Sequence, residues 1–186
     1  RAEGNCNITS CQSVTVIVNS LSSAASSVTA SSFSICPGST TTLTVNGGNL
    51  VAGDVWTWFE VGCGAGVSIG TGSNVTVSPI TATNYYVRAE GACGVTACAN
   101  ATISMNDLSI AANNITASSS NICVGQSVVL NVSGGILGTG ANWQWYSGAC
   151  GSGPVGTGNS ISVSPTATTT YFVRGEGTCG NSSCVD

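Results

Sequence analysis

Histidine and lysine are absent from this chain, and charge of either sign is scarce. Only 5% of its 186 residues are charged, against roughly 25% in an average soluble domain. The acids are dispersed and the serines have no base beside them, so no group is present that would activate a nucleophile. We therefore expect a protein that is not an enzyme and that uses neither a cofactor nor a metal.

The few cations do not form a basic patch. All are arginines, Arg1, Arg88 and Arg174, and the formal net charge is −4. Nucleic acid and anionic lipid both require clustered positive charge, so neither is an expected partner. No apolar run approaches the roughly 20 residues of a membrane-spanning helix. No charged, apolar leader is visible, so we read the chain as mature and secreted.

Cysteine is abundant, with ten residues and no Cys-x-x-Cys pair. Without histidine, this pattern argues against zinc or redox chemistry and for disulfides formed in an oxidising compartment. We predict an extracellular or cell-surface protein in which all ten are bonded. The disulfide cysteines are Cys6, Cys11, Cys36, Cys63, Cys93, Cys98, Cys123, Cys150, Cys179 and Cys184.

One segment occurs three times, as RAEGNCNITSC from Arg1, RAEGACGVTAC from Arg88 and RGEGTCGNSSC from Arg174. The spacing is 87 and then 86 residues (88 − 1 and 174 − 88). A repeat of this length is a whole small domain. The predicted divisions are a partial repeat at 1–20, a first domain at 21–107 and a second domain at 108–186.

Apolar side chains two residues apart predict short β-strands, and no stretch shows helical periodicity. The pairs in the first repeat are Leu43 with Val45, Trp56 with Trp58, Val75 with Val77, and Tyr85 with Val87. Those in the second are Leu130 with Val132, Trp143 with Trp145, Ile161 with Val163, and Tyr171 with Val173. Two facing sheets that bury these residues give an all-β sandwich in each repeat.

The order of these features resembles the immunoglobulin fold, with cysteine before the second strand, tryptophan on the third and tyrosine on the penultimate strand. The Cys-x-Gly, WxW, GTG, VSP and YxVR elements with a closing cysteine pair are similar to bacterial immunoglobulin-like repeats of large secreted surface proteins, especially of Bacteroidota. The resemblance covers nearly the whole chain. It implies tandem immunoglobulin-like β-sandwich domains that serve as stalks, filaments or spacers.

If the strands follow immunoglobulin order, the closing cysteines of each repeat face each other across a hairpin, and the other two share the opposite pole. The implied pairs are Cys93 with Cys98, Cys36 with Cys63, Cys179 with Cys184, Cys123 with Cys150, and Cys6 with Cys11. A long bridge from Cys36 to Cys98 is the alternative, because closing a larger loop stabilises more.

The two domains differ at their last strand. The first continues after Cys98 through alternating Ala101, Ile103 and Met105, whereas the second has two residues after Cys184. The alternating QSVTVIV of residues 12–18 stands at the repeat position of the missing strand.

Strand addition from a neighbour would repair such an edge. We predict Val14, Val16 and Val18 as the donor strand for the second domain of another copy, which gives a head-to-tail filament. In the alternative reading, the partial repeats are the ends of a window on a longer covalent array.

The favoured function is a structural subunit of an extracellular filament or surface stalk, with copies of itself as partners. The alternative is a carbohydrate-binding or adhesive repeat of a secreted adhesin or enzyme, in which the WxW segments stack on sugars; we favour core tryptophans. Surface glycans are a further expected partner. The glycosylation candidates in N-x-S/T sequons are Asn7, Asn74, Asn100, Asn114, Asn131 and Asn181.

Overall fold

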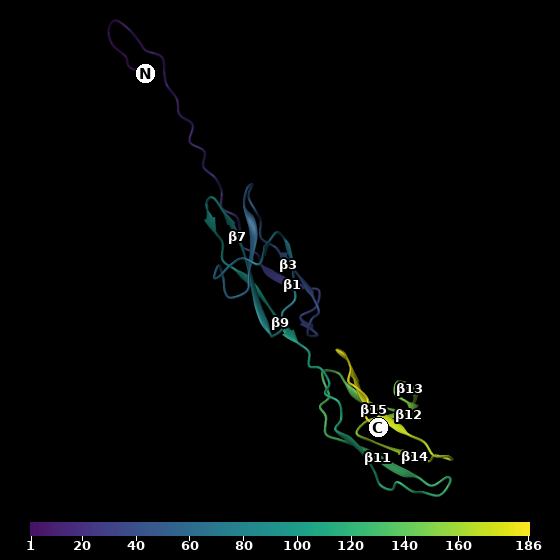
Figure 1. The fold of residues 1–186 in the computed structure, drawn as a ribbon. Coiled ribbons are helices and arrows are strands. Elements are labelled where there is room, and N and C mark those ends of the chain that lie inside the picture. The colour runs from purple at the N-terminus through teal and green to yellow at the C-terminus, as the bar shows by residue number, and fades with distance from the viewer.

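The computed structural model describes residues 1–186 and contains β-strands and no helix. Two β-sandwiches lie end to end, and residues 1–20 extend away from the first of them (Figure 1). The all-β tandem architecture predicted from the repeats is therefore confirmed. No helix is present that could span a membrane.

The first sandwich has two sheets, in the orders β1-β3-β6 and β2-β9-β7-β4-β5, with β8 paired to β7. Its strands are β1 (Ser27–Ala30), β2 (Ser34–Ile35), β3 (Thr41–Asn46), β4 (Val55–Phe59), β5 (Gly70–Thr71), β6 (Asn74–Val77), β7 (Thr83–Gly91), β8 (Gly94–Val95) and β9 (Ala99–Met105). All pairs are antiparallel except β2 with β9, which is parallel.

The second sandwich repeats this arrangement with sheets β10-β11-β14 and β13-β12-β15-β16. Its strands are β10 (Asn114–Ala117), β11 (Val128–Ser133), β12 (Asn142–Ala149), β13 (Ser152–Thr157), β14 (Ser160–Val163), β15 (Tyr171–Gly177) and β16 (Gly180–Asn181). It contains no strand equivalent to β2 or β9.

The tryptophans predicted for the core lie there. Trp56, Trp58, Trp143 and Trp145 are all buried, and Trp58 and Trp145 are fully enclosed. The indole Nε1 of Trp58 donates a hydrogen bond to the carbonyl of Gly72 (2.9 Å), and that of Trp145 donates to the equivalent glycine (2.8 Å). Each GTG element therefore satisfies the polar edge of a core tryptophan.

The second core is smaller than the first. Thirteen buried residues form the core cluster of the first sandwich and six form that of the second. Tyr171 and Ile122 are half-buried, whereas the equivalent Tyr85 and Ile35 are buried. In the first sandwich the additional burial comes from β9, whose Ala99, Ala101 and Ile103 belong to the cluster.

The predicted cysteine pairing is wrong, and none of the five local pairs forms. The disulfides are Cys36 with Cys179, Cys63 with Cys98, and Cys150 with Cys184. The four remaining cysteines are free thiols in this structure: Cys6, Cys11, Cys93 and Cys123. The alternative bridge from Cys36 to Cys98 is likewise not formed.

The geometry of the β7–β8 hairpin explains why Cys93 and Cys98 do not bond to each other. Gly91 pairs with Gly94, so Cys93 occupies the turn. Cys98 lies farther down the returning arm, since the next residue, Ala99, pairs with Val87. The two cysteines are thus separated along the hairpin.

Cys63 also lies elsewhere than predicted. The last pair of β4 is Phe59 with Tyr86, in the middle of β7, so β4 stops well short of the domain pole. The following loop folds back over the sheet, and Gly64 lies against the Arg88 guanidinium. Cys63 is therefore beside the start of β9, where Cys98 is its partner.

Candidate functional site

The second sandwich has an unpaired sheet edge along β15. In the first sandwich, Thr83 to Val87 of β7 pair with β9. On the equivalent edge of β15, only Val173 finds a partner, in an isolated bridge to Val185. Strand β15 also begins at Tyr171, two residues later than the start of β7 would predict. Backbone groups on this edge are left without a strand partner, which is the usual setting for strand addition.

A cavity of about 480 Å³ lies beside this edge. The residues that line it include Thr169, Tyr171, Ile122 and Leu130. The equivalents of these residues in the first sandwich surround β9, with Thr83 paired to Ile103 and Ile35 paired to Met105. The cavity therefore occupies the place that β9 fills in the first sandwich.

The predicted donor residues are exposed, and the last of them, Val18, lines a hollow together with residues of the first sandwich. Residues 12–18 form no strand, and Val14, Val16 and Val18 are 88%, 78% and 88% exposed. By the 87-residue repeat, these valines correspond to the inward residues Ala101, Ile103 and Met105 of β9, and Ile17 corresponds to the outward Ser104. Insertion of this segment into the cavity stays a prediction.

Residues 1–11 form a third copy of the closing hairpin. Glu3 pairs with Ile8 in a β-bridge, and Arg1 forms an ion pair with Glu3 (2.5 Å). Arg88 with Glu90 and Arg174 with Glu176 repeat this pair on β7 and β15. In this copy Cys6 and Cys11 are exposed free thiols.

The joint between the sandwiches is closed by a disulfide that the sequence did not predict. Strand β2 brings Cys36 to the end of β9, and the β15–β16 hairpin of the second sandwich brings Cys179 to the same place, with 5.3 Å between their Cα atoms. Figure 1 shows this hairpin reaching back toward the first sandwich. The Asp107 amide in the connection donates to Thr139 Oγ1 (2.9 Å), and the Thr139 amide donates to the Asp107 carbonyl (3.1 Å). The polypeptide connection and the Cys36–Cys179 disulfide thus join the two sandwiches covalently.

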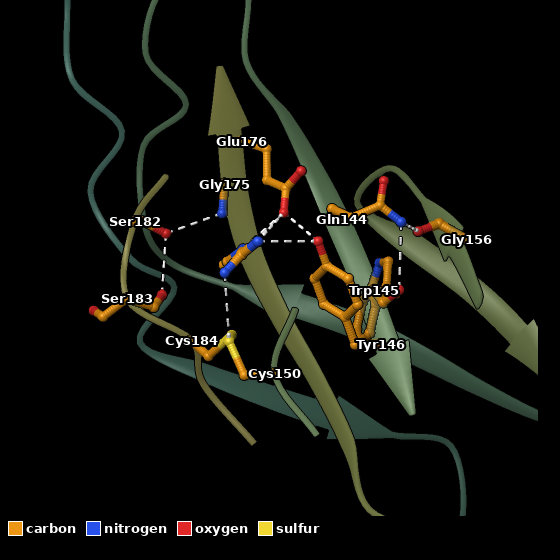
Figure 2. A network of polar contacts seen from close by, with 11 residues as sticks. Gln144, Trp145, Tyr146, Cys150, Gly156, Gly175, Glu176, Ser182, Ser183 and Cys184 are labelled. Atoms are coloured by element: carbon orange, nitrogen blue, oxygen red, sulfur yellow. Dashed lines mark hydrogen bonds and ion pairs between the residues drawn. A yellow bond between two sulfur atoms is a disulfide. The ribbon is translucent and has the colours of Figure 1, made fainter. Parts of the chain in front are cut away.

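Arg174, which pairs with Glu176, lies beside the disulfide of the second sandwich, and Figure 2 shows Glu176, Tyr146, Cys150 and Cys184 around it. Arg174 donates to Glu176 Oε1 from Nε (2.7 Å), stacks over the Tyr146 ring (5.2 Å to the centroid) and places Nη1 3.9 Å from Cys150 Sγ. The Tyr146 hydroxyl donates to the same Glu176 oxygen. The side chains of Arg174 and Glu176 are partly buried, so this ion pair is only partly solvated.

The first sandwich has the same arrangement of arginine, glutamate and aromatic ring, but its ring has no hydroxyl. Arg88 pairs with Glu90 and stacks over Phe59 at 5.2 Å. Phe59 stands where the second sandwich has Tyr146, so the hydroxyl contact to the carboxylate belongs to the second sandwich alone. In the first module Arg88 lies against Gly64, next to Cys63, and in the second module Arg174 lies beside Cys150.

Comparisons with known families agree with this architecture. The family model described as "Ig-like domain CHU_C associated" matches residues 24–107 and 111–186, which together span most of the chain. The chain belongs to this family of Ig-like domains. The match agrees with the resemblance to tandem bacterial immunoglobulin-like repeats. No curated protein sequence matches the chain.

Several solved structures match this chain at low sequence identity. The mouse nectin-like molecule 4 ectodomain (Ig1–Ig3) is 13% identical, with a TM-score of 0.37, 83% of this chain covered and 60% of that one. Three N-terminal domains of the bacteriophage RB49 Highly Immunogenic Outer Capsid protein (Hoc) are 14% identical, with a TM-score of 0.42 and coverages of 86% and 57%. The chain thus spans about three fifths of the length of these structures.

The sequence-predicted glycosylation candidates all lie on the surface of the Ig-like domains or of the N-terminal segment. The side chains of all six are exposed, at Asn7, Asn74, Asn100, Asn114, Asn131 and Asn181. Their modification stays a prediction. The WxW segments offer no sugar-stacking platform, because all four of their tryptophans are buried.

The contacts around Glu176 shift the pKa values of three groups. The hydrogen bond from Tyr146, followed by that from Arg174, lowers the pKa of Glu176 below its ordinary value. Burial, together with the contact to Glu176, raises the pKa of Tyr146. The hydrogen bond to Glu176 raises the pKa of Arg174. The charged carboxylate and the neutral phenol are therefore the forms that the folded domain favours.

This network predicts an acid-sensitive second domain. Because the pKa of Glu176 is lower in the folded than in the unfolded chain, its contribution is fully present above about pH 4.5 and is lost as the pH falls through the folded value. The Tm difference between wild type and Glu176→Gln should therefore shrink at acidic pH in calorimetry. Tyr146→Phe serves as a control that keeps the arginine and restores the residue type of the first domain. A pH-independent Tm difference for Glu176→Gln would contradict this account.

Proposed function

We propose that this chain is a structural subunit of an extracellular filament or surface stalk built from head-to-tail Ig-like domains. The second domain of each subunit accepts residues 12–18 of the following subunit as its last strand. The observation that carries this proposal is the cavity beside the unpaired edge of β15, which matches the place of β9 in the first domain. The alternating donor segment lies at the other end of the molecule (Figure 1).

The register of the added strand follows from the repeats. Val185 already pairs with Val173, as Ala99 pairs with Val87 in the first domain. The next inward position is that of Ala101, for which the repeat spacing supplies Val14. A donor that enters at Val14 continues the strand where the acceptor's own chain leaves it.

The donor's valines suit the cavity in size and polarity. Each valine that becomes fully buried contributes roughly 1.5–3 kcal/mol, and three of them point inward in this register. Fixing the backbone of the segment opposes this by roughly 1–2 kcal/mol per residue. The gain from burying the valines and the cost of ordering the backbone are therefore comparable. The valines specify the register of the added strand, and main-chain hydrogen bonds and contacts between the domains add affinity.

The positions of donor and acceptor favour growth of an open filament over closure into a ring. Donor and acceptor lie at opposite ends of an extended molecule, so the contact is heterologous and each addition exposes a new acceptor. Disulfides are typical of proteins in oxidising compartments, which supports a place outside the cell. The uncharged surface with six exposed sequon asparagines supports a glycan coat.

Substitutions on the two faces of the donor segment test the proposal. Val16→Asp places a charge at the inward position of Ile103 and should abolish concentration-dependent association in sedimentation velocity. Ile17→Asp is the matched control, because its position corresponds to the exposed Ser104 and the charge stays in solvent. Association should also slow the hydrogen exchange of the backbone amides of residues 169–172.

Two results would contradict strand donation. One is a wild-type chain that stays monomeric at the highest attainable concentration. The other is equal association of the Val16→Asp and Ile17→Asp variants.

A further inference from the structure

Two free cysteines correspond by the repeat to the two that close the joint. Cys123 stands at the position of Cys36, 87 residues later, and Cys93 stands at the position of Cys179, 86 residues earlier. Cys36 and Cys179 are bonded, whereas Cys93 and Cys123 are exposed thiols. The chain thus contains one complete Cys36–Cys179 joint. It also contains Cys93 and Cys123, which are equivalent to the two halves of that joint and have no partner in this structure.

The turn that presents Cys123 copies the turn that presents Cys36. Gly38 and Gly125 both adopt a φ of +81°, which the left-handed region allows without strain for glycine. The Ser39 amide donates to the Cys36 carbonyl (2.9 Å), and the Gln126 amide donates to the Cys123 carbonyl (3.0 Å). The backbone turn that carries Cys123 is therefore the same as the turn that carries Cys36 in the bonded joint.

The hairpin that presents Cys93 likewise copies the one around Cys179. Gly91 pairs with Gly94 in one hairpin, and Gly177 pairs with Gly180 in the other. A hollow of about 310 Å³ lies at this end of the first domain, lined by Ala92 and Cys93 and also by Val18, Asn19 and Ser20, which correspond by the repeat to residues 105–107 at the internal joint. The equivalents of these two residues in the second domain are Thr178 and Cys179, which face Cys36 across the joint. A preceding module is the matching occupant of this hollow.

We propose that Cys123 of one subunit forms a disulfide with Cys93 of the following subunit and so repeats the Cys36–Cys179 bond between chains. This inference rests on the proposed strand donation. When residues 14–18 enter the acceptor, residues 19–21 take the position of residues 106–108, the connection in the internal joint. The first domain of the donor then meets the acceptor as the second domain meets the first within one chain.

The bond requires an oxidant, for which a disulfide compound is the chemical class. The Cys93 thiolate attacks a disulfide R–S–S–R, forms a mixed disulfide and releases one thiol R–SH. The Cys123 thiolate of the partner then attacks the Cys93 sulfur, forms the Sγ–Sγ bond and releases the second thiol. Two cysteine protons and two electrons pass to the oxidant, whose single S–S bond becomes two thiols.

Cys6 also corresponds to Cys93 by the repeat, so the test is made in the full chain with Cys6→Ser and Cys11→Ser. Oxidation with a glutathione disulfide couple should give a ladder of multimers on non-reducing gels, and mass mapping should find Cys93 joined to Cys123. Two further variants of this chain, one with Cys93→Ser and one with Cys123→Ser, should each give no ladder when oxidised alone. Their mixture should stop at a heterodimer.

Association under reducing conditions separates this inference from the function on which it rests. Chains that associate when reduced but give no Cys93–Cys123 link on oxidation would overturn the disulfide and leave strand donation intact. Chains that do not associate when reduced would overturn both. Cys93–Cys93, Cys123–Cys123 and mixed links in a ratio of about 1:1:2, unchanged in denaturant, would show random oxidation of exposed thiols and also overturn the inference.

Discussion

Replacing Trp145 by alanine is expected to unfold the second domain while the first stays folded. Trp145 is fully enclosed, and its indole donates to the Gly158 carbonyl. Large-to-small substitution of a buried tryptophan costs about 3–5 kcal/mol, while ordinary domains are stable by only about 5–15 kcal/mol. A core of six buried residues without a closing strand has little stability to lose.

Hydrogen exchange measured peptide by peptide reports the two domains separately. In Trp145→Ala, protection should disappear from β12 and β15 and persist in β4 and β7. Trp58→Ala is the matched control, because it removes the equivalent side chain from a core of thirteen buried residues. That variant should lower the Tm of the first domain without unfolding it at room temperature. Retained protection of β12 in Trp145→Ala would show that the missing strand matters less than we infer.

Removal of the Cys150–Cys184 disulfide is expected to have the second large effect. The bonded residues are 34 apart in sequence, and closing a loop of this size stabilises by about 3–4 kcal/mol through the entropy of the unfolded chain. Cys184 also anchors Val185, whose bridge to Val173 is the only strand pairing of residues 171–173 on that edge of β15, since β16 pairs farther along it. The Cys150→Ser/Cys184→Ser variant should therefore lose the entropic contribution and this pairing together.

The first domain again supplies the control. Cys63 and Cys98 are 35 residues apart, so Cys63→Ser/Cys98→Ser loses nearly the same loop entropy. In the first domain, however, β9 stays paired along its length with β7. Calorimetry should show a Tm decrease of about 4–8 °C per kcal/mol for each domain, with the larger decrease in the second. Equal decreases would mean that Val185 contributes nothing measurable to the stability of the second domain.

Much of the fold could be predicted because local patterns determine it. Alternation at Leu43 and Val45, or at Trp56 and Trp58, specifies which face of a strand is buried, and tertiary contacts do not override it here. The three copies of the arginine segment showed that the sandwich occurs in tandem. The difference between the domains at β9 also followed from comparing their sequences.

The disulfides could not be predicted, for a different physical reason in each case. The bond between Cys36 and Cys179 depends on how two domain poles meet, and sequence spacing carries no information about that contact. The bond between Cys63 and Cys98 depends on where β4 stops along β7 and on the return of the next loop over the sheet. The repeat register, which relates Cys36 to Cys123 over 87 residues and Cys93 to Cys179 over 86 residues, shows which cysteines are equivalent but not which of them bond.

The Cys36–Cys179 bond also determines how the subunit responds to tension. The bonded residues are 143 apart in sequence, so a pull on the two ends of the chain travels through the sulfurs and bypasses nearly everything between them. At up to about 3.5 Å per residue, roughly 500 Å of contour length is withheld from extension. A thread made of such subunits would keep its length under loads that unravel domains joined by peptide linkers alone, and a reducing agent would make it extensible.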